Sequence, residues 1–153
     1  MKSVQTLAMV VKDDKILLGM KKRGFGQGKW NGFGGKVEEG EAIEDAVRRE
    51  VFEESGIEVL ELSEVGILNF FFPDGKAQPE VHIFHVMKYE SEPTESEEMK
   101  PEWFEISKIP YDSMWADDPI WLPMFLAGKK FGGEVYFDKQ GGVKKHNIAA
   151  ASN

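Results

Sequence analysis

One segment of the chain, residues 42–55, predicts a helix whose apolar and acidic positions lie side by side. Ile43, Val47 and Val51 recur at helical spacing and form an apolar stripe along one face. Gly56 follows directly and is typical of the residue that ends a helix, because glycine adopts a left-handed backbone without strain. The segment therefore predicts a helix packed against a core along that stripe.

Three carboxylates border this stripe. Glu50, Glu53 and Glu54 have the i, i+3, i+4 spacing of one helical face, where like charges repel and desolvation at the rim of the packed face is costly. Glutamates on a helix are more commonly a solvated surface, and ordinary i, i+4 ion pairs precede these three. A bound divalent cation would remove both penalties, and carboxylate oxygens are ligands that Mg²⁺ prefers in sites that act on phosphates.

The acidic positions belong to a longer spaced pattern. Beginning at Gly35 and ending at Ile57, it has the form G-x5-E-x7-R-E-U-x-E-E-x-G-U, where U is a bulky apolar residue. This pattern resembles the signature of the Nudix hydrolases, which cleave nucleoside diphosphates linked to another group, and every specified position is filled. The resemblance implies an α/β Nudix fold, in which a mixed β-sheet is sandwiched between helices and carries a loop-helix-loop catalytic box.

The resemblance also implies roles for these residues. It implies Mg²⁺, with Mn²⁺ as an alternative, held by the following metal ligands: the Gly34 backbone carbonyl, Glu50, Glu53, Glu54 and Glu98 from an acidic loop. Bound metal would bridge the phosphates and activate water for attack on the β-phosphorus. Either Glu54 or Glu50 could accept the water proton, and the sequence does not choose between them. We expect Arg49 to orient a glutamate and Glu41 to support the loop through charge-assisted hydrogen bonds.

Composition limits the other possibilities. The 153 residues, 41% of them hydrophobic, suit a single Nudix domain spanning 1–153. A net charge of −8 disfavours binding to a nucleic-acid polymer or an anionic membrane, and the absence of cysteine excludes disulfides and a thiol nucleophile. The apolar run from Val4 to Val11 is too short to span a membrane. We expect a cytoplasmic protein, and nothing in the sequence demands self-association, so we expect a monomer.

Alternating apolar residues and turn signals predict the remaining elements. Asp118 is expected to be the N-cap and Pro119 the first residue of a second helix that runs to about Leu126. Residues 149–153 are expected to be frayed. Strands are predicted at 4–11, 16–22, 65–72, 81–89, 102–106, 133–138 and 143–148, with a glycine-rich segment at 23–36.

Four segments outside the box carry a narrower resemblance. Residues 19–26, 30–36, 99–104 and 114–118 are similar to the animal Nudix subfamily that hydrolyses oxidised purine nucleoside triphosphates. That resemblance implies Mg²⁺-dependent hydrolysis of 8-oxo-dGTP and 2-hydroxy-dATP to a monophosphate and pyrophosphate, which sanitises the nucleotide pool and serves DNA repair. The alternatives are a Nudix diphosphatase for a dinucleotide polyphosphate, a nucleotide sugar or a normal dNTP, and a nucleotide-binding module without catalysis.

Purine recognition needs apolar walls and a few polar groups for the base edge. Asp117 and Asp118 stand out, because two adjacent carboxylates in an apolar pocket resist double ionisation, so that one can hold a proton while its neighbour accepts. Moving that proton would let one pocket bind oxidised guanine or oxidised adenine. The resemblance implies that Asn31, Trp115, Asp117 and Asp118 bind the base and that Thr6 and Lys21 also line the pocket. The further candidate substrate-binding residues are Phe25, Phe33, Gly35, Lys36, Phe70 and Phe72. His82 and His85 are expected on opposite faces of a strand and hence not in a joint metal site.

Overall fold

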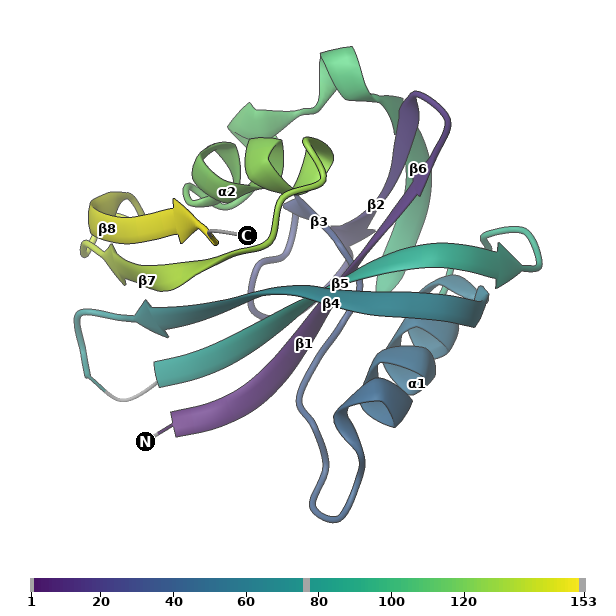
Figure 1. The fold of residues 1–153 in the computed structure, drawn as a ribbon, viewed down its shortest axis with the longest axis horizontal. Helices are drawn as coiled ribbons and strands as arrows, with labels where there is room; N and C mark the ends of the chain where they lie inside the picture. Colours follow the sequence, from purple (N-terminus) through teal and green to yellow (C-terminus); the bar gives the residue numbers. More distant parts are fainter. Residues whose placement is uncertain (1, 76–77, 152–153) are drawn as a thin grey trace.

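The computed structural model describes residues 2–75 and 78–151, and its described strands form one eight-stranded sheet (Figure 1). The strand order is β3-β2-β1-β5-β4-β7-β8, with β6 paired to β2. The elements are β1 (Lys2–Lys12), β2 (Lys15–Lys21), β3 (Trp30–Asn31), α1 (Ile43–Ser55), β4 (Glu58–Phe71), β5 (Gln78–Glu90), β6 (Met99–Glu105), η1 (Ile106–Lys108), η2 (Tyr111–Ser113), α2 (Asp118–Leu126), β7 (Phe131–Phe137) and β8 (Val143–Ala150).

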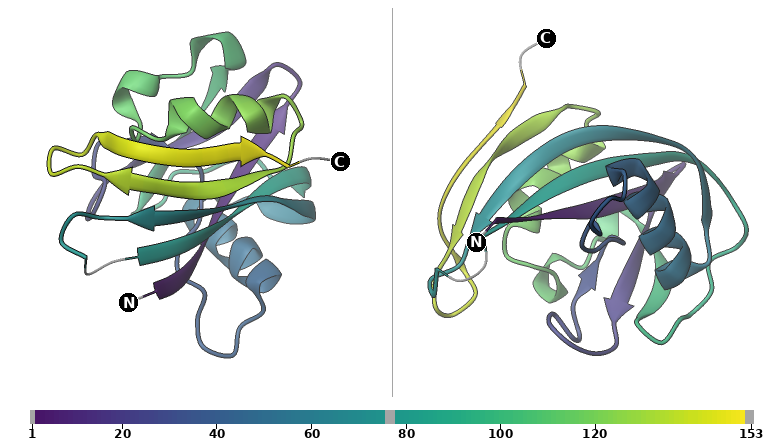
Figure 2. Two further views of the ribbon diagram at one scale, coloured as in Figure 1. Left: turned by 60° about the vertical axis from the view of Figure 1, so that its left-hand side comes forward. Right: turned by 90° about the horizontal axis from the view of Figure 1, so that it is seen from below.

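The sheet is mixed, as predicted. β1 and β5 run parallel, as do β4 and β7, whereas the hairpin pairs β1/β2, β4/β5 and β7/β8 are antiparallel. The sheet curves strongly in the view from below (Figure 2). That the whole chain is one domain stays a prediction.

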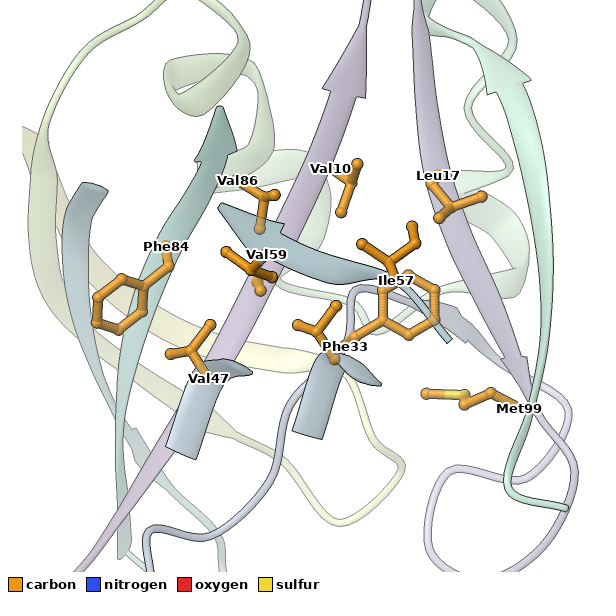
Figure 3. Close-up of a cluster of buried hydrophobic side chains, with 11 residues drawn as sticks. Val10, Leu17, Phe33, Val47, Ile57, Val59, Phe84, Val86 and Met99 are labelled. Carbon is orange, nitrogen blue, oxygen red and sulfur yellow. The ribbon is translucent and has the colours of Figure 1, made fainter. Parts of the chain in front are cut away.

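Each helix packs on its own apolar cluster. The cluster beneath α1 gathers Val47 and Val51 with residues of β1, β4 and β5. Figure 3 shows Val47 near Val59 and Phe84 in this cluster. A second cluster gathers Trp121 and Leu122 of α2 with residues of β1, β2, β5 and β7. The apolar stripe predicted for the first helix is therefore confirmed, and it fixes which face of α1 turns toward the sheet.

Gly56 ends α1 with a positive φ of 76°, and its N–H donates to the carbonyl of Phe52 over 2.9 Å. The predicted C-terminal cap is thus confirmed. The predicted strands all exist, with ends displaced by a few residues; β4 differs most, because it begins at Glu58, directly after the helix. The short strand β3 lies inside the segment that was expected to be a loop.

Two predictions are wrong, one about the start of α2 and one about the C-terminal residues. Asp118 is the first residue of α2 rather than its N-cap; Asp117 holds the cap position and makes no capping hydrogen bond with its side chain. Ala149 and Ala150 are not frayed, because they pair with Gly132 and Phe131 across β7 and β8, and the Ala151 N–H donates to Lys130. Residues 152 and 153 lie outside the described part of the chain.

Candidate active site

The glycine-rich segment before α1 is bonded to strand β1. Ala8 and Phe33 exchange backbone hydrogen bonds of 2.6 and 3.0 Å, and the Thr6 N–H donates to the Gly35 carbonyl over 2.8 Å. A Cβ on Gly34 would lie 1.9 Å from the Thr6 carbonyl oxygen, which no side chain can occupy. Glycine is required at position 34 because the backbone passes directly over β1.

This packing overturns one predicted substrate contact. The Phe33 side chain is fully buried and belongs to the core cluster beneath α1. It does not line the cavity described below. The prediction that Phe33 binds substrate is therefore wrong, because its ring fills the core while its backbone is bonded to Ala8.

The three glutamates of α1, hereafter the glutamate cluster, differ in burial. Glu54 is only 7% exposed, and one of its carboxylate oxygens accepts the Gly34 N–H over 2.9 Å. Burial raises the pKa of Glu54 to about 8, and the neighbouring Glu50 adds to the rise. Burial also raises the pKa of Glu50, whereas Glu53 is exposed. Position around the axis of α1 therefore decides how buried each glutamate is, with Glu54 buried, Glu50 half-buried and Glu53 exposed.

The donor set of the glutamate cluster fits a hard divalent cation. All its groups are carboxylate oxygens, and a Cβ on Gly35 would lie 2.8 Å from the Glu50 carboxyl carbon, so glycine leaves that carboxylate room. Among residues 2–75 and 78–151, no three acidic or histidine side chains stand close enough to hold a metal together. The carboxylates repel one another and turn to separate donors, Glu54 to Gly34 and Glu50 to Arg49.

Arg49 binds the glutamates that precede and follow it, as its predicted orienting role requires. Its Nε and Nη2 donate to the two oxygens of Glu41 over 2.8 and 3.0 Å, and its Nη1 donates to Glu50 over 2.8 Å. Glu41 also accepts the Glu38 N–H over 3.1 Å, and Arg49 Nη2 donates to the Lys36 carbonyl. Hydrogen bonds with Arg49 lower the pKa of Glu41. Arg49 thus joins the loop that precedes α1, through Lys36 and Glu41, to the helix itself.

Glu98 lies near the glutamate cluster but is bound elsewhere. Its carboxylate accepts two hydrogen bonds from Arg23, of 2.7 and 3.1 Å, and the bond from Arg23 lowers its pKa. The negative charge of Glu98 still contributes to the raised pKa of Glu54. Of the predicted metal ligands, Glu98 is therefore the one paired to a cation outside α1.

A cavity of about 800 Å³ extends from this region. It is lined by every predicted substrate residue except Phe33, and also by two predicted metal ligands, Gly34 and Glu54. Glu50, Glu53, Glu98 and Arg49 do not line it. The other lining residues include Gln5, Leu7, Gly26, Lys29, Pro79, Val81, Met99, Phe137 and Lys139.

Aromatic rings form one wall of the cavity. The Phe25 and Trp115 rings are stacked, with centroids 5.0 Å apart and planes 19° from parallel. Phe70 and Phe72 both stack on Phe137, at 5.8 and 5.1 Å, which confirms that they share a face. Phe137 itself was missed: alternation in its strand marks it as inward-facing, but only the fold brings β7 beside the β4 end.

The aspartate pair, Asp117 and Asp118, is buried in the same cavity, at 4% and 2% exposure. Asp117 Oδ2 accepts the Trp121 indole N–H over 2.8 Å, and burial raises the pKa of Asp117 to about 6. Asp118 Oδ2 is the one buried side-chain polar atom of the described residues without a hydrogen-bond partner. Burial, and then the charge of Asp117, raise the pKa of Asp118 well above its usual range. One of the two carboxyls is therefore protonated near neutral pH.

Smaller polar groups complete the lining. Asn31 Oδ1 accepts the Gly32 N–H over 2.8 Å, which leaves its amide nitrogen as the donor it can offer to a ligand. The Thr6 hydroxyl lies 3.4 Å from the Gly35 carbonyl, and Lys21 and Lys36 supply positive charge.

The two strand histidines lie outside this site. His82 is bonded to Glu64 and Glu80 over 2.7 and 2.8 Å, whereas the His85 ring packs against Phe125 of α2. The prediction that the two histidines lie on opposite faces of the strand is confirmed.

An acidic helix following a glycine-rich loop, both set on a mixed sheet, defines the Nudix class of hydrolases. The NUDIX domain family matches residues 1–125. The chain belongs to the Nudix family. It is 55% identical over 143 residues to the oxidized purine nucleoside triphosphate hydrolase of Danio rerio, and 48% identical to that of Mus musculus. Each match covers 94% of this chain and 92% of the relative.

Solved structures agree with this assignment. The crystal structure of a MutT protein from Bacillus halodurans superposes with a TM-score of 0.81 at 27% identity, covering 95% of this chain and 97% of that one. Within the described residues, no helix is long and apolar enough to cross a membrane.

Proposed function

We propose that this Nudix hydrolase cleaves oxidised purine nucleoside triphosphates to a monophosphate and pyrophosphate. The observation that carries the proposal is the aspartate pair in the cavity that Glu54 also lines: both carboxyls are buried, and one oxygen, Asp118 Oδ2, has no hydrogen-bond partner among the described residues. A buried orphan carboxyl is costly unless a ligand satisfies it. The relatives from Danio rerio and Mus musculus are named for this activity, and the match with this chain covers 92% of each of them.

The glutamate cluster, the Gly34 carbonyl and Glu98 are the proposed ligands for Mg²⁺ or Mn²⁺. When bound, the metal would neutralise triphosphate charge and lower the pKa of a water molecule. Arg49 holds Glu50 in place for this role through its 2.8 Å hydrogen bond. Lys21 and Lys36 line the cavity and supply positive charge for the phosphates.

Glu54 is the better candidate for the general base. It lines the cavity, and burial gives it a pKa of about 8, which suits proton transfer near neutral pH. Glu50 does not line the cavity, and its carboxylate is already bound by Arg49. We therefore assign the water proton to Glu54.

The aspartate pair is proposed to bind the base edge. A protonated Asp118 donates and an ionised Asp117 accepts, and exchange of the proton would reverse the two roles. Asn31 supplies a further donor, and the stacked Phe25 and Trp115 rings offer an apolar face for a purine. One pocket could then accept 8-oxoguanine or 2-hydroxyadenine. A cytoplasmic location, a role in DNA repair and a monomeric state stay predictions.

The test is pyrophosphate release from 8-oxo-dGTP, 2-hydroxy-dATP, dGTP, ADP-ribose and diadenosine polyphosphates at matched low concentrations. We expect turnover of the two oxidised nucleotides to exceed that of the others, to require Mg²⁺, and to be largely lost in Glu53→Gln. Turnover confined to ADP-ribose and diadenosine polyphosphates would replace this proposal with another Nudix substrate. Nucleotide binding without turnover would indicate a binding module.

A further inference from the structure

Arg23 makes the closest contact with Glu98. Its Nε and Nη2 both donate to Glu98 Oε1, over 3.1 and 2.7 Å, and Nη2 also lies 3.4 Å from Glu97. The Arg23 side chain is 60% exposed and that of Glu98 is 44% exposed, so the pair stands at the surface. None of the roles proposed above uses Arg23.

Further bonds join the same two segments, residues 22–29, hereafter the aromatic loop, and residues 91–98, the acidic segment. The Lys22 N–H donates to the Glu98 carbonyl over 2.8 Å, and Lys22 Nζ donates to the Ser96 carbonyl over 2.9 Å and pairs with Glu95. The acidic segment is itself bonded to α1, because the Ser96 hydroxyl donates to the Glu54 carbonyl over 3.0 Å. The aromatic loop is therefore connected to the residue that lines the cavity from α1.

The other contact of the aromatic loop is with Trp115. Phe25, two residues after Arg23, stacks on the Trp115 ring, and a Cβ on Gly26 would lie 3.2 Å from the same ring. The loop is closed at its base by backbone bonds of 3.1 and 2.9 Å between Lys21 and residues 29 and 28. The aromatic loop thus contacts Glu98 through Arg23 and the aromatic wall of the cavity through Phe25.

We propose that Arg23 is a positioning residue that couples Glu98 to the aromatic loop, so that a divalent cation and the closed loop compete for one carboxylate. This rests on the proposed metal-dependent function. A guanidinium and a divalent cation repel each other at one carboxylate, so each weakens the other's hold on Glu98. The cation that binds Glu98 loosens the loop that carries Phe25.

The coupling predicts opposite effects on two ligands. Arg23→Gln removes the competing charge, so Mg²⁺ binds about twofold to fivefold more tightly, the range that one exposed ion pair supplies. The same change frees the aromatic loop before the cation binds, so 8-oxo-dGTP binds less tightly in the absence of Mg²⁺, whereas KM and kcat at saturating Mg²⁺, where the wild-type loop is already released, stay near the wild-type values. A merely structural role for Arg23 would weaken both ligands together.

The first experiment is calorimetric titration of the nucleotide-free protein with Mg²⁺. Lys100→Gln is the matched control, because Lys100 is an exposed cation that acts on Glu95 from a distance and is not bonded to Glu98. We expect tighter binding in Arg23→Gln and unchanged binding in Lys100→Gln. Equal or weaker Mg²⁺ binding in Arg23→Gln would overturn the coupling alone. Absence of Mg²⁺ binding to the wild type would overturn the proposed function and the coupling together.

The second experiment is hydrogen exchange at the backbone amides of Gln27, Gly28 and Lys29, which donate within the aromatic loop and at its base. We expect Mg²⁺ to speed this exchange in the wild type. In Arg23→Gln the exchange should already be fast without Mg²⁺ and should not change when it is added. If saturating Mg²⁺ leaves the exchange rates of these amides unchanged in the wild type, the cation does not loosen the loop and the coupling is rejected.

Discussion

Two groups of carboxylates lie around one cavity, and the protein surrounds them with different partners. The glutamate cluster stands beside the Arg49 guanidinium and the Gly34 N–H, with Lys21 near enough to act on Glu54. The aspartate pair has the Trp121 indole N–H for Asp117 and no partner for Asp118 Oδ2 among the described residues. Burial raises carboxyl pKa values in both groups, those of Glu50 and Glu54 in the first and those of Asp117 and Asp118 in the second. The groups differ in their partners, because Arg49 and Lys21 act on the first group, where an added cation would favour the ionised form, whereas Asp118 keeps an oxygen without a partner and favours a retained proton.

The difference comes from the elements that carry the two groups. On α1, Glu53 is exposed and Glu50 half-buried, so water and ions can reach them, whereas Glu54 is buried and lines the cavity. Asp117 and Asp118 begin α2, whose Trp121 and Leu122 are fully or almost fully buried in the second core cluster. The same chemical group is therefore proposed to bind metal at one site and to hydrogen-bond to the base at the other.

The largest effect is expected from Glu54→Gln. Glutamine can still accept the Gly34 N–H. It cannot take a proton from water, however, and it has no negative charge with which to bind a cation. We expect kcat to fall about 10²–10⁴-fold on every nucleotide tested, the range typical of a lost general base. Pyrophosphate release under saturating Mg²⁺ measures this.

The matched control for that change is Glu58→Gln, an exposed glutamate that follows α1 and begins β4. It should retain wild-type kcat. A loss in Glu54→Gln confined to one nucleotide would place Glu54 in base selection instead, and would remove the contrast between the two groups.

Local sequence patterns predicted the glutamate cluster well, because helical spacing places its members on one face whatever the rest of the chain does. The stripe of α1, the Gly56 cap and the Arg49 contacts all lie between Lys36 and Gly56, in the helix or directly beside it. Long-range contacts were not predictable in this way. Arg23 and Glu98 are 75 positions apart, and their pairing depends on how two loops meet.

The aspartate pair shows the same limit. Asp118 before Pro119 fits a helix cap by local rules, yet the carboxylate is buried, because packing of Trp121 draws the start of α2 into the core. Phe33 was misassigned for a related reason. It lies in the glycine-rich segment 23–36, whose course the sequence does not fix, and an isolated antiparallel bridge to Ala8 holds its backbone on β1 while its ring packs in the core.

The second prediction concerns stability and pH. A carboxyl whose pKa is raised by folding binds its proton more tightly in the folded state, so stability is highest below its unfolded pKa, near 4, and falls as pH rises toward the folded value. Asp118→Asn removes that loss. We expect the variant to be more stable than the wild type at pH 8, with a higher Tm.

Thermal unfolding at pH 4, 6 and 8, without metal or nucleotide, checks this. The gain should shrink toward pH 4, where protonation of Asp118 in the unfolded chain removes most of the difference between the two states. The same gain at all three values would mean that the asparagine improves packing or hydrogen bonding, and that the aspartate pair carries no special proton.

The smallest effect is expected in base selection by Asp117→Asn. Asparagine can still accept the Trp121 N–H, but it fixes one donor and one acceptor where the carboxyl could change its proton. We expect the ratio of kcat/KM between 8-oxo-dGTP and 2-hydroxy-dATP to change about tenfold, since one base-edge contact discriminates by about 1–3 kcal/mol. The fold-decrease in kcat on either nucleotide should be smaller than the fold-change in this ratio of kcat/KM.

Asp112→Asn is the control, because Asp112 is an exposed acid in η2, close in sequence to the pair, and does not line the cavity. Its ratio should match the wild type. Equal losses on both nucleotides in Asp117→Asn would show that this carboxyl shapes the cavity without choosing the base. The proton would then have no part in substrate choice, and the two groups of carboxylates would differ only in burial.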